Sequence, residues 1–132
     1  MQNILSKENL EKILNIHFTK PTILFLFPGL GVGNIYNELA GCTLQTHEME
    51  VISKSYKNID FIGISTQIVP DNNSYIKYIQ IQKDIAQYFD TTKKEKEIYL
   101  KRITYIINDK IDIYKNTSSN LHIEFVKEKL SK

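Results

Sequence analysis

The sequence has little cysteine, proline or arginine. Its 132 residues include one cysteine, three prolines and five glycines. A single cysteine cannot form an internal disulfide, so the fold does not depend on an oxidising compartment. Arg102 is the only arginine among seventeen basic side chains. In a cationic surface made otherwise of lysine, a lone arginine indicates either a site that needs a fixed, permanently charged planar group or a surface residue at a strand start.

The chain also lacks an excess of charge and a long apolar run. Seventeen basic and fifteen acidic side chains give a net charge of +2, which by itself does not indicate nucleic acid or an anionic membrane as a partner. The longest apolar run is far short of a membrane span. Charged residues occur too early in the sequence for a signal peptide. We therefore expect a cytoplasmic protein that folds as a single domain over residues 1–132.

The stretch that leads to Cys42 carries the strongest pattern. Residues 22–27 are β-branched, aliphatic and aromatic without alternation, which predicts a strand buried on both faces. A loop over 28–41 follows, and then a predicted helix over 42–56. A thiol in the first turn of a helix lies where the macrodipole and unpaired N–H groups favour a thiolate. The alternative is an inert buried cysteine, the commoner fate of a lone thiol.

The remaining elements suggest a fold order. A second buried strand over 61–66 completes a βαβ unit, whose two strands we expect to be parallel. A βαβ unit followed by a β-hairpin and a last helix is the thioredoxin-like order, an α/β fold with a central mixed sheet flanked by helices. In that order the reactive thiol lies where Cys42 stands. The other predicted elements are a helix over 7–15, one helical turn within 34–39, a short extended piece over 78–82, a helix over 83–89, a solvated charge run over 91–97, hairpin strands over 103–108 and 111–115, and an amphipathic helix over 121–130 on Leu121, Phe125, Val126 and Leu130.

In this topology Arg102, at the start of the first hairpin strand, is expected beside the end of the sheet that carries the thiol. A guanidinium there would lower the pKa of the thiol and hold a polar substrate oxygen.

Metal and cofactor chemistry have weaker signals. Cys42, His47 and a carboxylate could together bind a metal, but the three histidines, at 17, 47 and 122, lack paired-ligand spacing, so we expect no metal site. Gly29, Gly31 and Gly33 follow a strand, as in a nucleotide-binding loop, but the dinucleotide fingerprint needs its third glycine one residue later and a helix beginning on it. A turn-rich loop is the favoured interpretation, and no cofactor is expected.

Four stretches together resemble the peroxiredoxins, most closely the bacterioferritin-comigratory branch and a redoxin-like group near it. The resemblance covers roughly residues 20–130 and rests on Phe27-Pro28, Gly-Cys-Thr-Leu-Gln at 41–45, Phe-Ile-Gly-Ile-Ser-Thr-Gln at 61–67 and Leu-Lys-Arg-Ile-Thr at 100–104.

The resemblance implies a thiol peroxidase. Cys42 matches the peroxidatic cysteine, and Arg102 matches the arginine that stabilises its thiolate and the peroxide. Pro28 matches the proline that shields the pocket, while Thr43 and Gln45 fall in the helical turn after the cysteine.

The chain departs from the family at three points. Leu39 stands where the family usually has threonine, His47 where the close branch often has a resolving cysteine, and the loop between Pro28 and Cys42 is long.

The leading hypothesis is a one-cysteine peroxidase that acts on hydrogen peroxide or alkyl hydroperoxides. With no second cysteine, its reductant must be an external thiol such as glutathione, glutaredoxin or thioredoxin. We expect a monomer or homodimer without nucleic-acid or membrane partners. The alternatives are a thioredoxin-like redox sensor or binding module with little turnover, which Leu39 favours, and a nucleotide-binding protein that uses Gly29–Gly33.

Overall fold

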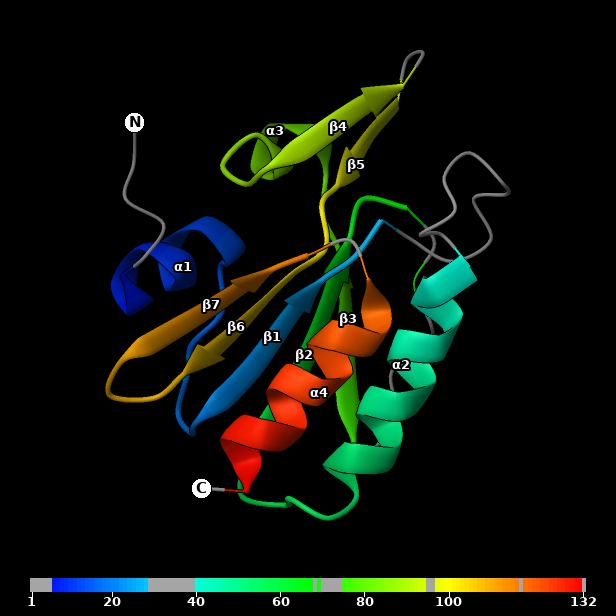
Figure 1. Cartoon of the computed structure of the whole chain (residues 1–132). Coiled ribbons are helices and arrows are strands. Elements are labelled where there is room, and N and C mark those ends of the chain that lie inside the picture. The colour runs from blue at the N-terminus through cyan, green and yellow to red at the C-terminus, as the bar shows by residue number, and fades with distance from the viewer. Residues whose placement is uncertain are drawn as a thin grey trace.

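The protein is a mixed α/β structure built on one five-stranded sheet (Figure 1). The computed structural model describes residues 6–28, 40–67, 69, 75–94, 97–116 and 118–131, and at 40–44 and 94 it describes the backbone alone. The strands are β1 (Thr22–Leu26), β2 (Asp60–Ser65), β3 (Ile76–Gln80), β4 (Thr91–Lys94), β5 (Glu97–Leu100), β6 (Ile103–Ile107) and β7 (Ile111–Lys115), and the helices are α1 (Lys7–Leu14), α2 (Ala40–Ser53), α3 (Lys83–Ala86) and α4 (Ser119–Leu130).

Strand β1 lies at the centre of the main sheet, whose order is β3-β2-β1-β6-β7. It pairs with β2 in parallel and with β6 antiparallel, and β3 joins β2 in parallel. All five residues of β1 are buried, as the unbroken apolar run predicts. The βαβ unit made by β1, α2 and β2 and the hairpin of β6 and β7 are confirmed.

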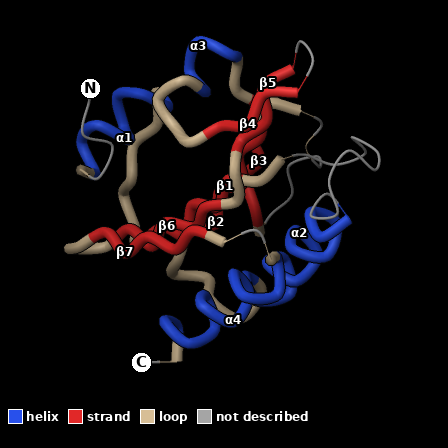
Figure 2. The backbone as a smooth tube through the Cα atoms, turned by 45° about the horizontal axis from the view of Figure 1, so that its top comes forward, coloured by secondary structure: helices blue, strands red, loops and turns tan. Residues whose placement is uncertain are grey.

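Helices cover both faces of this sheet. Figure 2 shows α1 and α3 on one side and α2 and α4 on the other. Because side chains alternate along a strand, Leu24 and Leu26 of β1 enter the core under α1 and α3, while Ile23 and Phe25 enter the core under α2 and α4. The sheet therefore separates two hydrophobic cores. None of the helices in the described part of the chain is long and apolar enough to cross a membrane.

Helix α1 begins where its sequence predicts. The Ser6 side chain accepts a hydrogen bond from the Asn9 N–H at 3.1 Å, which caps the first turn. Asn15 ends the helix in the left-handed conformation, with φ of 54°. Leu10, Ile13 and Leu14 form the buried stripe of the helix.

The predicted helices over 42–56 and 83–89 both stop three residues before their expected C-terminal ends. Helix α2 ends at Ser53, and α3 is a single turn that ends at Ala86. In both places the chain continues as turns with bonds between residues three apart, Tyr56 to Ser53 and Phe89 to Ala86. Such tighter bonds replace the α-helical pattern at a helix end.

The charge run over 91–97 is exposed at Lys93 and Glu97, as predicted, but it also forms strands that the sequence did not predict. Residues 91–94 form β4, which pairs antiparallel with β5 in a separate two-stranded sheet. The pairing partners of β4 include Tyr99 and Leu100, which are both buried. The second strand, β5, thus supplies the buried apolar side chains of the hairpin. The polar first strand, β4, is extended because it pairs with β5. The extended piece expected over 78–82 is β3, which begins two residues earlier at Ile76.

Helix α4 packs with most of the expected face, because Val126 is buried and Phe125 and Leu130 pack partly against the core, but Leu121 does not contribute to it. Leu121 is 41% exposed, whereas the buried residues are Ser119, His122, Ile123 and Val126. These four have the helical spacing of one face, and α4 packs against α2 and β6 with it. A histidine therefore occupies a core position that the apolar pattern had assigned to leucine.

Gly63 in β2 is required by close aromatic packing. A Cβ added there would lie 2.7 Å from the Tyr78 ring and 2.9 Å from the Phe25 ring. Phe25 and Phe27 stack with centroids 5.8 Å apart, and Tyr78 meets both edge-on. Any side chain at this position would displace that cluster.

Candidate functional site

Arg102 is buried on the face of the sheet that α2 covers. It is 3% exposed, so the interpretation as a surface residue is wrong. Its position two residues before Thr104, a buried residue opposite Phe25 in the β1–β6 pairing, gives both side chains the same face. The guanidinium Nη1 donates a hydrogen bond to the Gln45 Oε1 of α2. The two residues are 57 positions apart in the chain.

This contact places the arginine one helical turn from Cys42. Cys42 is the third residue of α2 and Gln45 is the sixth. Residues three apart lie on the same side of a helix as neighbours. The side chains of Cys42 and Thr43 lie outside the described residues, as do the expected turn within 34–39 and the glycines at 29, 31 and 33. The backbone nevertheless puts position 42 in the first turn of a helix whose next turn holds the guanidinium.

Gln45 brings an unsatisfied donor to the same place. Its side chain is fully buried, and its Nε2 has no hydrogen-bond partner in the part of the chain that the structure describes. A buried donor without an acceptor costs about 1–3 kcal/mol. An amide N–H beside an arginine forms a pair of donors suited to an incoming oxygen atom. The arrangement is therefore fitted to hold a polar oxygen between α2 and β6.

Pro28 is tied to the end of β2. It is buried, and its carbonyl accepts a hydrogen bond from the Ser65 hydroxyl at 2.9 Å. The same hydroxyl oxygen accepts from the Gln67 N–H at 3.0 Å. Because β1 and β2 are parallel, Pro28 and Ser65 both lie at the carboxyl ends of these strands, the end of the sheet where α2 begins (Figure 1). The structure thus brings Gln45 and Arg102 into contact and fixes Pro28 separately.

His122 is a site residue that the sequence did not reveal. Its Nε2 lies 2.7 Å from the Asn116 carbonyl oxygen, and its Nδ1 lies 2.8 Å from the Thr104 hydroxyl. A carbonyl oxygen can only accept, so Nε2 carries the proton and Nδ1 accepts from Thr104. The spacing of residues 119, 122, 123 and 126 was the available signal.

The surroundings of His122 hold its imidazole neutral. The pKa of His122 is lowered to about 4, chiefly by burial; the hydrogen bond to the Asn116 backbone raises it, and the positive charge of Arg102 lowers it. Tyr114 meets the ring edge-on at 4.9 Å between centroids. In the α2/α4 core, Arg102 is therefore charged while the nearby histidine is not.

Metal ligation has no support in the described residues. They contain no group of three or more histidine, cysteine, aspartate or glutamate side chains that could hold an ion. His17 pairs with Glu11 at 2.8 Å on the opposite side of the sheet, and His47 is exposed.

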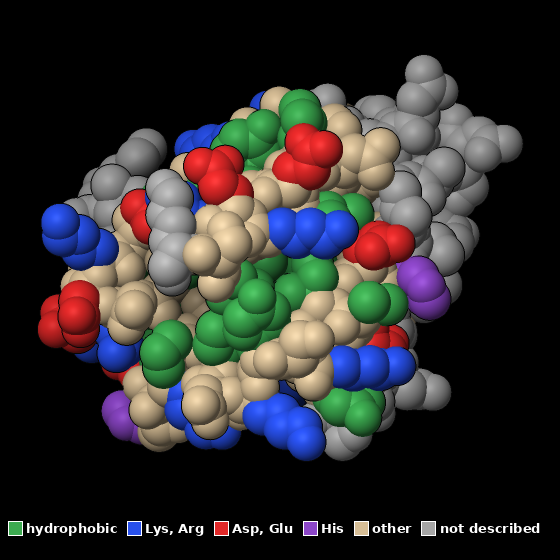
Figure 3. Space-filling view, turned by 60° about the horizontal axis from the view of Figure 1, so that its bottom comes forward, with side chains coloured by type: hydrophobic (Ala, Val, Ile, Leu, Met, Phe, Trp, Pro, Cys, Tyr) green, Lys and Arg blue, Asp and Glu red, His purple; other side chains and the backbone are tan. Residues whose placement is uncertain are grey.

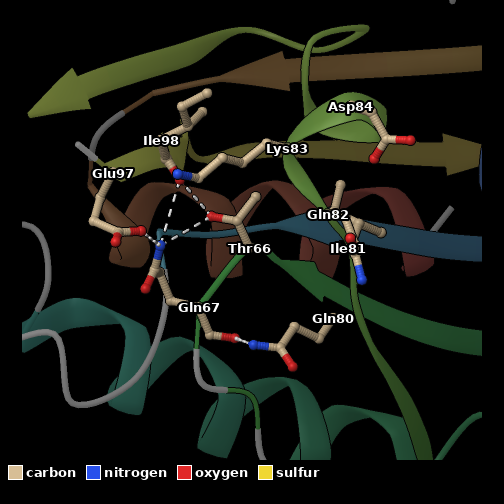
Figure 4. A pocket seen from close by; sticks show the side chains of 9 residues that line it. All are labelled: Thr66, Gln67, Gln80, Ile81, Gln82, Lys83, Asp84, Glu97 and Ile98. Atoms are coloured by element: carbon tan, nitrogen blue, oxygen red, sulfur yellow. Dashed lines mark hydrogen bonds between the residues drawn. The ribbon is translucent and has the colours of Figure 1, made fainter.

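Two cavities lie at the end of the sheet where β1 and β2 end and β6 begins. One, of about 340 Å³, lies beside Arg102 between the start of β4 and the end of β7. The larger, of about 570 Å³, lies between the ends of β2 and β3 and the β4–β5 hairpin (Figure 4). On the face seen in Figure 3, lysines and acidic side chains surround hydrophobic ones, without a broad field of one sign.

Comparisons with known proteins add no assignment. No protein-family model, curated protein or solved structure matches the chain.

Proposed function

We propose that this protein is a one-cysteine thiol peroxidase of the peroxiredoxin type, with a thioredoxin-like fold and a cytoplasmic location. The observation that carries the proposal is the contact between the buried Arg102 guanidinium and Gln45, one helical turn after Cys42. A fixed positive charge held beside the following turn favours the thiolate form of a cysteine in the first turn of a helix.

The order of elements supports the thioredoxin-like part of the proposal. The parallel strands β1 and β2 flank α2, the antiparallel hairpin β6–β7 follows, and α4 completes the order. In such an order the thiol belongs at the start of the helix after β1, and Cys42 occupies that position.

The proposed reaction begins with nucleophilic attack. The Cys42 thiolate attacks the terminal oxygen of the peroxide, the O–O bond breaks, and the leaving alkoxide or hydroxide takes a proton from solvent. Cysteine sulfenic acid and an alcohol, or water, are formed. Arg102 and the Gln45 amide stabilise the negative charge that moves onto the peroxide oxygens, since both donors are in place before reaction.

Reduction must then come from outside the chain. A first thiol condenses with the sulfenic acid to give a mixed disulfide and water. A second thiol attacks that disulfide and returns Cys42 as a thiol, with release of the oxidised reductant. The chain's single cysteine makes this external route necessary.

The decisive experiment follows Cys42 by intact-protein mass spectrometry after stoichiometric hydrogen peroxide at neutral pH. We expect rapid formation of the sulfenic acid, trapped with dimedone, and at least a hundredfold slower oxidation in Arg102→Lys, because an ammonium cannot reproduce the planar donor pair. Lys101→Arg, at the exposed neighbouring position, is the matched control and should react as the parent does.

Oxidation at the rate of a free thiol, indifferent to Arg102, would contradict the peroxidase. A lowered thiol pKa together with slow peroxide reaction would instead favour the redox sensor or binding module, for which Leu39 in place of the family threonine is the supporting observation.

A further inference from the structure

Arg102 stands directly before β6, at the place where β7 leads into α4 (Figure 1). Asn116 comes directly after β7, and its N–H donates a hydrogen bond to the Arg102 carbonyl at 3.4 Å. The guanidinium of the same arginine donates to Gln45 of α2. Arg102 is therefore held at its backbone by the segment after β7 and at its side chain by α2.

His122 of α4 joins this segment to β6. Its Nε2 donates to the Asn116 carbonyl at 2.7 Å, and its Nδ1 accepts from the Thr104 hydroxyl at 2.8 Å. Thr104 lies two residues after Arg102, on the same face of β6. The contacts form a closed ring, which runs from the Arg102 carbonyl through Asn116 to the imidazole and returns along β6 through the threonine. The position of the start of β6 thus depends on α4.

The members of this ring are shielded from water. His122 and Thr104 have no solvent exposure, and Arg102 is 3% exposed. The Tyr114 ring covers the imidazole edge-on. Water cannot easily replace a hydrogen bond that is lost at this depth, so each bond of the ring constrains the geometry more strongly than the same bond on the surface.

A neutral imidazole suits this position because it supplies one donor and one acceptor without adding positive charge. The pKa of His122 is lowered to about 4, chiefly by burial, and the positive charge of Arg102 also lowers it. That influence means that the two groups lie close enough to interact. An aliphatic side chain would fill the same space without either hydrogen bond, and a lysine would repel the guanidinium.

We propose that His122 is a positioning residue, which fixes the start of β6 through its two hydrogen bonds and thereby holds the Arg102 guanidinium beside α2. The consequence of this role for peroxide chemistry rests on the proposed function. The histidine itself touches no substrate and exchanges no proton in the reaction. When the ring is opened, the guanidinium shifts relative to Gln45, and the positive charge beside the first turns of α2 is less well placed.

The test uses the fact that Arg102 is the only arginine of the chain. In protein labelled with ¹⁵N-arginine, the guanidinium gives a single Nε–Hε signal, whose chemical shift and solvent exchange report its surroundings. Thr104→Val removes the hydroxyl and keeps the shape of the side chain. We expect a displaced signal with about fivefold faster solvent exchange. Thr104→Ser keeps the hydroxyl and should retain the signal of the parent.

Thr22→Val is the matched control for the loss of a buried hydroxyl. Thr22 is buried and its hydroxyl donates to the Lys20 carbonyl at 2.9 Å, but it lies at the other end of β1 and on the opposite face of the sheet. It should leave the Arg102 signal unchanged. An Arg102 signal that is indifferent to Thr104→Val, that is displaced equally by Thr22→Val, or that Thr104→Ser fails to retain overturns the proposal.

A second variant tests the histidine directly. His122→Phe fills the space of the imidazole without its hydrogen bonds and should displace the Arg102 signal as Thr104→Val does. An unmoved signal in folded His122→Phe also overturns the proposal. If this core variant does not fold, the comparison of valine and serine at position 104 decides alone, since both changes are conservative in size.

Peroxide kinetics separate this role from the proposed reaction. In the mass-spectrometric assay, oxidation of Cys42 should be about tenfold slower in Thr104→Val and unchanged in Thr104→Ser and Thr22→Val. A displaced Arg102 signal in a protein whose Cys42 is inert to peroxide supports the positioning role and overturns the peroxidase. Rapid oxidation that Thr104→Val leaves unchanged, together with an unmoved Arg102 signal, overturns the positioning role and supports the peroxidase.

Discussion

The two faces of the central sheet carry different kinds of core. Under α1 and α3, residues such as Leu24, Leu26 and Tyr105 form a cluster of aliphatic and aromatic side chains. Under α2 and α4, the apolar cluster is interrupted by Arg102 and His122, both almost fully buried and both hydrogen-bonded. The same strands supply both faces, since alternate residues point to opposite sides.

This difference separates stability from chemistry within one sheet. Apolar burial contributes stability without demanding partners, whereas each buried polar group must be paired or it destabilises the fold. The face under α2 and α4 meets that demand for His122 through Thr104 and Asn116, whereas one Gln45 donor finds no acceptor among the residues that the structure describes. We infer that the first face holds the fold and the second adapts it for a ligand.

The largest stability effect is expected on the apolar face. Leu24→Ala removes a side chain with no solvent exposure and should cost about 2–5 kcal/mol of unfolding free energy, measured in urea. Leu121→Ala, at an exposed position, is the control and should cost less than about 0.5 kcal/mol. Equal costs would show that the two positions are packed alike, against the structure.

The polar face should reveal itself through acid sensitivity. His122 has a pKa of about 4 when folded and an ordinary value of 6.5, so between these values the unfolded chain binds more protons. Stability should fall as pH drops from about 6.5 to about 4, by roughly 3 kcal/mol in all. Unfolding free energies of the parent and His122→Gln, compared at pH 7, 5.5 and 4.5, should converge toward acid pH. A constant difference would mean that His122 does not titrate differently in the two states.

A smaller effect is expected from the aromatic cluster on the same face. Gly63→Ala places a methyl group against the Tyr78 ring and should cost about 1–3 kcal/mol. In a double-mutant cycle, Tyr78→Leu should relieve part of that cost, because the ring that collides is gone. Additive effects in thermal or urea unfolding would argue that the strain lies elsewhere.

Local patterns were enough to predict much of the fold. The apolar run of β1, the Ser6 cap and the βαβ spacing each depend on neighbouring residues, and the structure confirms all three. The hairpin over β4 and β5 was missed because β4 is polar and becomes a strand through its partner. A strand that is held by its pairing partner carries little sign of its structure in its own residues.

The sequence was enough to single out residues of the candidate site, but not to predict which of them are in contact. Being the only arginine singled out Arg102, and the helix start singled out Cys42 and Gln45, but the bond between Arg102 and Gln45 joins segments that are distant in sequence. His122 was missed because polar residues are usually assigned to the surface. Its burial depends on a hydroxyl and a carbonyl supplied by other elements.

The central position of β1 also sets the order in which the chain can fold. Its parallel partner β2 arrives after one helix, but its other partner comes far later, since Leu26 pairs with Ile103 and Thr22 with Ile107. Contacts this far apart slow folding. During synthesis, the N–H and C=O groups on one edge of β1 stay unpaired until most of the chain has emerged. An unpaired edge on an apolar strand can pair with another chain. Dilution or a chaperone should therefore raise the refolding yield more than a change of pH or salt.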